Sequence, residues 1–111
     1  MAHDLFALVP DPPAIMAPRI NFQAPVGATV RLWLYVDGVP TPEVTWMHRK
    51  RKLSAAVPDD KFPRKRVELL IQDVKKKDFG RYKCVVFNAL GTAHIELALL
   101  GTSLSGRLRP S

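Results

Sequence analysis

Cys84 is the only cysteine of the 111-residue chain, and its thiol is the side chain with the most versatile chemistry. A thiol acts as a nucleophile or a redox group through its thiolate form. Around it, Tyr82, Cys84 and Val86 alternate with Lys83 and Val85. In a strand this alternation turns Cys84 toward the interior, where burial raises the pKa of a thiol. We therefore expect an inert, buried cysteine that forms no internal disulfide.

Histidine and serine offer little further chemistry. His3, His48 and His94 have no second ligand at a spacing typical of metal sites. Ser54 and the serines near the C-terminus have no base close by, and no pair of carboxylates is placed for acid–base work. The sequence predicts no metal, no cofactor, no small-molecule substrate and no enzymatic activity.

Positive charge is the strongest bias of the composition. The net charge is +7 and the pI is about 10.0, which favours anionic partners without identifying one. Three clusters carry the charge: residues 48–52, Lys61 with residues 64–66, and residues 75–77. Three interpretations remain open: an ordinary solvated surface, an acidic protein partner, or the phosphates of nucleic acid or anionic lipid.

The elements that position these groups are predicted to be short strands. Apolar residues alternate with polar ones in residues 30–36, 69–72, 82–87 and 95–99, and Val44 to Trp46 opens a further strand. Gly- and Pro-rich breaks separate the segments, as in a sandwich or barrel. One helical turn is expected, from Lys75 to Asp78. A hydrophobic content of 47% is enough for one core.

The two ends differ from the centre. Prolines at positions 10, 12, 13 and 18 argue against a helix and against most ladder pairing, so residues 1–17 are predicted to be an extended linker. Residues 18–100 are the expected domain, and residues 101–111 are expected to be a disordered tail. No apolar run has the roughly 18 residues of a transmembrane helix, and no positive signal-peptide region opens the chain.

A compact motif indicates the fold. Asp78-x-Gly80-x-Tyr82-x-Cys84 follows a strand that reads Leu-x-Ile-x-x-Val, and Trp46 precedes it at the spacing of a core tryptophan. This arrangement resembles the E-to-F corner of immunoglobulin domains, most closely those of the intermediate set (I-set). The resemblance covers about residues 18 to 100. It implies an all-β sandwich of two antiparallel sheets in which the Tyr82 phenol bonds to backbone upstream.

One departure from the family pattern points to a subgroup. Leu34 stands where the first disulfide cysteine is found, opposite Cys84. The missing disulfide would be worth roughly 3 to 4 kcal/mol, so packing of Leu34, Trp46 and Cys84 must compensate. In lacking this disulfide, the chain resembles the cytosolic immunoglobulin domains of muscle filament proteins such as titin, myosin-binding protein C, myomesin and obscurin. Together with the absence of Asn-x-Ser/Thr sites, this favours a cytoplasmic location in the sarcomere or cytoskeleton.

Strand alternation also predicts two outward faces. Trp33 and Tyr35 should lie beside Leu70 on one sheet, unless the N-terminal segment or basic side chains cover them. The other sheet should present a mixed basic and apolar face formed by Met47, Arg49, Lys83, Val85 and Phe87. The alternative is an ordinary solvated face in which Phe87 is tucked under a loop.

The resemblance and these faces predict a non-catalytic structural and protein-interaction module of a sarcomeric or cytoskeletal multidomain protein. The partner would be a filament protein or a neighbouring domain. A binder of nucleic acid or anionic lipid, acting through the basic clusters, is the first alternative. An extracellular adhesion or receptor domain is the second.

Overall fold

The computed structural model describes residues 9–53 and 65–102. Several predictions fall outside these residues. They concern residues 1–8 of the expected linker, residues 103–111 of the expected tail, His3, Ser54, and Lys61 and Arg64 of the second basic cluster.

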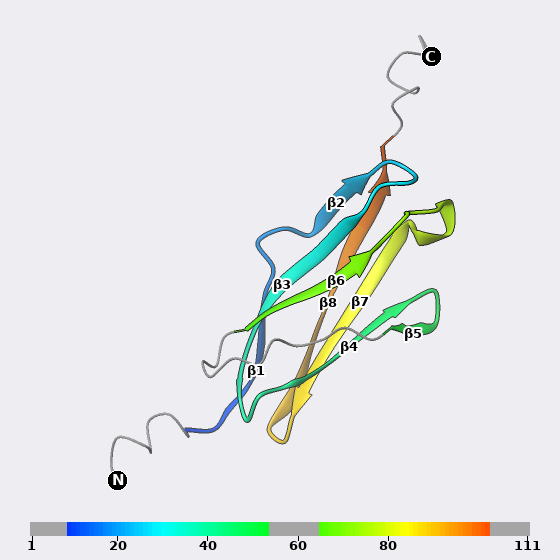
Figure 1. Ribbon diagram of the computed structural model, residues 1–111. Coiled ribbons are helices and arrows are strands. Elements are labelled where there is room, and N and C mark those ends of the chain that lie inside the picture. Colours follow the sequence, from blue (N-terminus) through cyan, green and yellow to red (C-terminus); the bar gives the residue numbers. More distant parts are fainter. Residues whose placement is uncertain (1–8, 54–64, 103–111) are drawn as a thin grey trace.

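The described chain forms two facing sheets (Figure 1). The first contains β1 (Asp11–Met16), β3 (Val30–Val39) and β6 (Lys65–Ile71), in that order. The second has the order β2 (Asn21–Ala24), β8 (Gly91–Gly101), β7 (Gly80–Asn88), β4 (Glu43–His48) and β5 (Arg51–Leu53). All pairings are antiparallel except that of β2 with β8. The predicted all-β immunoglobulin-like sandwich without an internal disulfide is confirmed.

The core lies between the sheets and follows the predicted alternation. Leu32, Leu34 and Val36 of β3 point inward, and they meet the inward residues of β7 and β8. Each buried aliphatic side chain contributes about 1.5–3 kcal/mol relative to exposure. The remaining core residues come from both sheets: Phe22, Ala24, Trp46, Val67, Leu69, Tyr82, Cys84, Val86, Leu97 and Leu99.

The segment Asp11–Met16 is a strand, which contradicts the prediction that its prolines exclude most ladder pairing. Ala14, Ile15 and Met16 pair with β3, and Asp11 pairs with Val39. The register shifts between Asp11 and Ala14, where Pro12 and Pro13 stand, so the missing N–H groups fall at an irregularity. Asn88 Nδ2 further binds the carbonyl oxygen of Asp11 at 3.0 Å.

The C-terminal strand also runs beyond the predicted domain end. β8 includes Gly101, which pairs with Ala24, although residues from 101 onward were expected to be disordered. The start of β1 and the end of β8 lie at opposite ends of the sandwich (Figure 1). The described domain therefore has its two chain ends far apart.

A short connection joins β6 to β7. It contains η1 (Lys76–Asp78), a single 3-10 turn where the helical turn was predicted. The Tyr82 hydroxyl donates to the carbonyl oxygen of Asp78 at 2.5 Å. Gly80 enters β7 with φ of +123°, a conformation that favours glycine. These contacts form the backbone corner that the sequence motif implies.

Candidate protein-binding surfaces

Cys84 lies in the centre of the core and offers no accessible chemistry. Leu34, Trp46 and Cys84 are all fully buried. Burial raises the pKa of the Cys84 thiol to about 12, which keeps it protonated at neutral pH. The described residues contain no group of three or more His, Cys, Asp or Glu side chains that could hold a metal ion.

The predicted aromatic face lies on the outside of the β1–β3–β6 sheet. Trp33 and Tyr35 are half-buried there, and their rings meet edge to face with centroids 5.8 Å apart. The guanidinium carbon of Arg66 lies 4.5 Å from the Trp33 ring centroid. The rings of Trp33 and Phe22 also meet edge to face, with centroids 6.4 Å apart. The basic side chain of Arg66 therefore covers part of this face, which agrees with the alternative that basic side chains lie over it.

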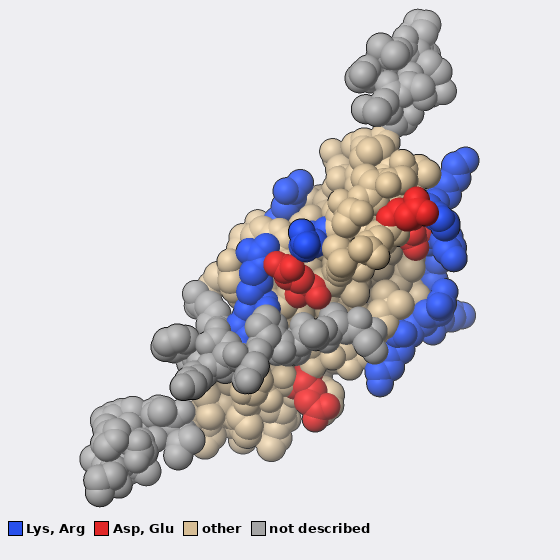
Figure 2. Space-filling model, viewed as in Figure 1, with Lys and Arg blue, Asp and Glu red and all other residues tan. Residues whose placement is uncertain are grey.

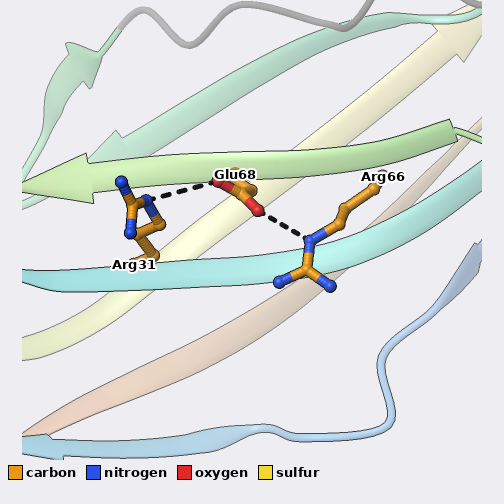
Figure 3. A network of polar contacts seen from close by, with 3 residues as sticks. All are labelled: Arg31, Arg66 and Glu68. Atoms are coloured by element: carbon orange, nitrogen blue, oxygen red, sulfur yellow. Dashed lines mark hydrogen bonds and ion pairs between the residues drawn. The ribbon is translucent and has the colours of Figure 1, made fainter.

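Charged side chains complete the cover. Glu68 accepts a hydrogen bond from Arg66 Nε at 2.7 Å, and its other oxygen lies 3.5 Å from Arg31 Nε (Figure 3). The Glu68 hydrogen bond is the main reason that the pKa of Arg66 is raised. In the β3–β6 register Glu68 is paired with Trp33, while Leu70 is paired with Arg31. Leu70 is 47% exposed, but charged groups stand beside it, so this face is less apolar than predicted.

The second predicted face is formed by β4 and β7. Its cross-strand pairs are Met47 with Lys83, Thr45 with Val85, and Glu43 with Phe87, all on the outer side of the five-stranded sheet. Met47 is 37% and Phe87 40% exposed, while Val85 is half-buried. Phe87 is thus exposed to solvent. The register brings Met47, Lys83, Val85 and Phe87 together as one surface, which we call the β4–β7 face.

Arg49 does not belong to the β4–β7 face, contrary to the prediction. Arg49 and Lys50 have φ of 51° and 66° and form the tight turn between β4 and β5. The strand ends at His48, so side-chain alternation no longer applies. Arg49 Nε and Nη2 instead donate to the carbonyl oxygens of Lys77 and Phe79, each at 3.1 Å.

His48 was not singled out by sequence reasoning as a structural residue, yet it joins two elements. Its Nδ1 lies 3.0 Å from the carbonyl oxygen of Arg81, and its Nε2 lies 3.0 Å from that of Lys77. The ring is 8% exposed. Strand alternation could have predicted this burial, because His48 lies two residues after Trp46 and so on the same inward side of β4. Its role is to tie the β4–β5 hairpin to the connection that holds η1.

These contacts decide how the basic clusters lie. Residues 49–52 and 75–77 are brought to the same end of the sandwich, since Arg49 and His48 bind the backbone of the η1 connection. The second cluster is divided: Lys65 is buried and Arg66 lies over Trp33. Two of the three clusters therefore form one surface.

Comparison of the sequence with known protein families agrees with the observed sandwich fold. The family model described as "Immunoglobulin I-set domain" matches residues 13–100. The chain therefore belongs to the immunoglobulin I-set family. Domains of this family are protein-interaction modules with structural or adhesive roles.

Curated relatives contain the domain as a small part. The chain is 36% identical over 90 residues to human "Leucine-rich repeats and immunoglobulin-like domains protein 1", covering 79% of this chain and 8% of that protein. It is 30% identical over 98 residues to "Neural cell adhesion molecule 1-A" of Xenopus laevis, covering 86% and 9% respectively. The chain thus spans less than a tenth of these two relatives.

Among solved structures, the titin domain M4 is similar over its whole length. The identity is 27% and the TM-score 0.69, covering 85% of this chain and 99% of that one. Proteins similar to this chain thus include both titin and a neural cell adhesion molecule. The described residues contain no helix with the length and apolar composition needed to cross a bilayer.

Proposed function

We propose that this chain is a non-catalytic structural domain that binds a protein partner through the β4–β7 face. The observation that carries the proposal is the alignment of exposed Met47 and Phe87 with Val85 on one sheet surface, with Lys83 beside them. Exposed apolar side chains on a flat, regular surface lose contact with water when a partner covers them. The opposite sheet offers less, because Arg66 already covers Trp33.

The setting that we propose is a multidomain filament protein of the sarcomere or cytoskeleton. Leu34 packs in the same core as Cys84 and Trp46, so the fold does not depend on an oxidising compartment. The likeness to titin M4 supports the same setting. The described chain also enters and leaves at opposite ends of the sandwich, which suits domains connected in series (Figure 1).

The binding face is tested by pull-down from muscle lysate with Met47→Ala/Phe87→Ala. We expect this variant to lose the partner, because both changes remove exposed apolar contact area. Ile20→Ala/Val26→Ala is the matched control, since both of its residues are exposed apolar groups elsewhere, at 51% and 58%. Trp33→Ala/Tyr35→Ala tests the covered face separately. Retention of the partner by Met47→Ala/Phe87→Ala would show that the β4–β7 face is not the binding surface.

A second setting is favoured by the curated relatives. Neural cell adhesion molecule 1-A carries its role in its name, and an adhesive domain would use an exposed sheet face in the same way. Immunostaining of the full-length protein separates the two settings. Striated labelling after permeabilisation supports the filament setting, whereas labelling of intact cells supports adhesion.

A further inference from the structure

The β4–β5 hairpin and the η1 connection are locked together at one end of the molecule. Arg49 reaches two carbonyl oxygens of the connection, at Lys77 and Phe79, and His48 reaches Lys77 as well. Between the hairpin and the end of β6 lies an open groove of about 470 Å³. These hydrogen bonds fix the hairpin against the η1 connection, and residues of both border the groove.

The rim of this groove is strongly basic. Residues 49–52 and 75–77 are seven Lys and Arg residues, and all of them are exposed. Figure 2 shows Lys and Arg side chains along the edge where the hairpin and η1 lie. Two carboxylates also line the groove: Asp73 pairs with Lys75 Nζ at 2.9 Å, and Asp78 accepts from the Lys75 backbone N–H at 2.8 Å. The excess positive charge faces solvent.

The groove is not only charged. Arg51, Lys75 and Lys77 line it together with two aliphatic residues that pack against the core, Leu53 and Ile71, which we call the aliphatic row. Leu53 and Ile71 are half-buried, whereas Leu69 belongs to the buried core and Leu70 lies on the outer face of its sheet beside Arg31. A ligand that fits this lining has both carboxylates for the rim and apolar side chains for the aliphatic row.

We propose that this groove binds an acidic segment of a partner protein that also carries aliphatic side chains. The site is separate from the β4–β7 face, and it adds a partner chemistry to the proposed protein-binding role, on which it rests. Carboxylates of the segment would pair with Arg51 and Lys77, while its apolar side chains cover Leu53 and Ile71.

Other polyanions fit less well. Single-stranded nucleic acid gains much of its affinity from stacking on aromatic side chains. The aromatic rings that line this groove are those of His48 and Tyr82, which are both buried and stacked on each other. Sulfated polysaccharides and anionic lipid headgroups would pair with the rim and leave the aliphatic row uncovered. An acidic peptide uses both parts of the lining.

The test measures fluorescence-detected binding of the purified chain to a synthetic peptide of alternating Leu and Glu. A peptide of alternating Ser and Glu, equal in length and charge, is the control probe. We expect the Leu–Glu peptide to bind about tenfold more tightly, which corresponds to about 1.4 kcal/mol. Arg51→Gln/Lys77→Gln should weaken its binding about tenfold, and Leu53→Gln should remove its advantage over the Ser–Glu peptide.

Matched variants make the result specific. Arg19→Gln/Lys83→Gln removes two exposed positive charges that do not line the groove and should leave binding within about twofold. Met47→Ala/Phe87→Ala should also bind the peptide normally, so failure of the β4–β7 proposal is distinguishable from failure of this one. Equal binding of the two peptides would overturn the proposal. Tighter binding of heparin, RNA or phosphoinositide vesicles than of the Leu–Glu peptide would also overturn it.

Discussion

His48 and Tyr82 stack face to face, with ring centroids 4.0 Å apart and ring planes 6° apart. The pair joins the end of β4 to the start of β7. His48 contacts the carbonyl oxygens of Lys77 and Arg81, and Tyr82 donates to that of Asp78. One compact unit therefore holds the η1 connection, the β4–β5 hairpin and the core together.

Replacing His48 by leucine should destabilise the domain by about 2–3 kcal/mol. The substitution removes both ring nitrogens that approach carbonyl oxygens, so at least one of these part-buried acceptors loses its donor. Urea unfolding followed by tryptophan fluorescence measures the change. His94→Leu is the matched control, because His94 is exposed on β8, and its effect should stay within about 0.5 kcal/mol. Equal effects of the two substitutions would contradict the role of His48.

Tyr82 should make stability fall at alkaline pH. Burial, assisted by the charge of Asp78, raises the pKa of Tyr82 to about 12, against about 10 in the unfolded chain. The folded state therefore retains a proton that the unfolded state loses, so stability present below about pH 10 decreases between about pH 10 and 12. The slope from this group is at most about 1.4 kcal/mol per pH unit. Urea midpoints across this range measure it.

Tyr82→Phe is the control for the pH effect. It should lower stability by about 1–2 kcal/mol at neutral pH, since the carbonyl oxygen of Asp78 loses its donor. Above about pH 10 its stability should fall less steeply than that of the wild type. A parallel fall in both proteins would assign the alkaline loss to other groups.

How much of this unit follows from sequence depends on how local each contact is. The Tyr82 hydroxyl bonds to a carbonyl oxygen only four residues upstream, so this corner could be predicted from the sequence. Strand alternation places Leu34, Trp46 and Cys84 inside, so their burial could be predicted as well. The His48 contacts bridge 29 and 33 residues, and they depend on where the strand ends.

The outer faces show the same limit. Alternation predicts that Trp33 points outward, but its cover by Arg66 requires the register between β3 and β6. The turn after His48 likewise removes Arg49 from the sheet face. Nor does alternation reveal β1, because its prolines fall at a register shift that only the paired strand defines.

The Cys84 thiol should resist labelling in the native state. It is fully buried, and burial raises its pKa to about 12, so neither access nor thiolate is available near neutral pH. Reaction with a chromogenic disulfide reagent should follow the rate of domain opening and become fast in urea. Rapid stoichiometric labelling of the folded protein would show an accessible thiol instead.

Leu34→Cys should restore the disulfide that the family pattern contains. Leu34 and Cys84 are both fully buried in one core cluster, on strands of facing sheets. A bond between positions 34 and 84 closes a loop of about 50 residues, which stabilises a domain by roughly 3 to 4 kcal/mol in the chain-entropy model.

The comparison is between the oxidised and the reduced forms of the same Leu34→Cys variant, so the effect of losing the leucine side chain cancels. Urea unfolding gives the difference, and mass spectrometry after thiol blocking reports the bond. A variant that folds but retains two free thiols under oxidising conditions would show that the two side chains do not meet across the core.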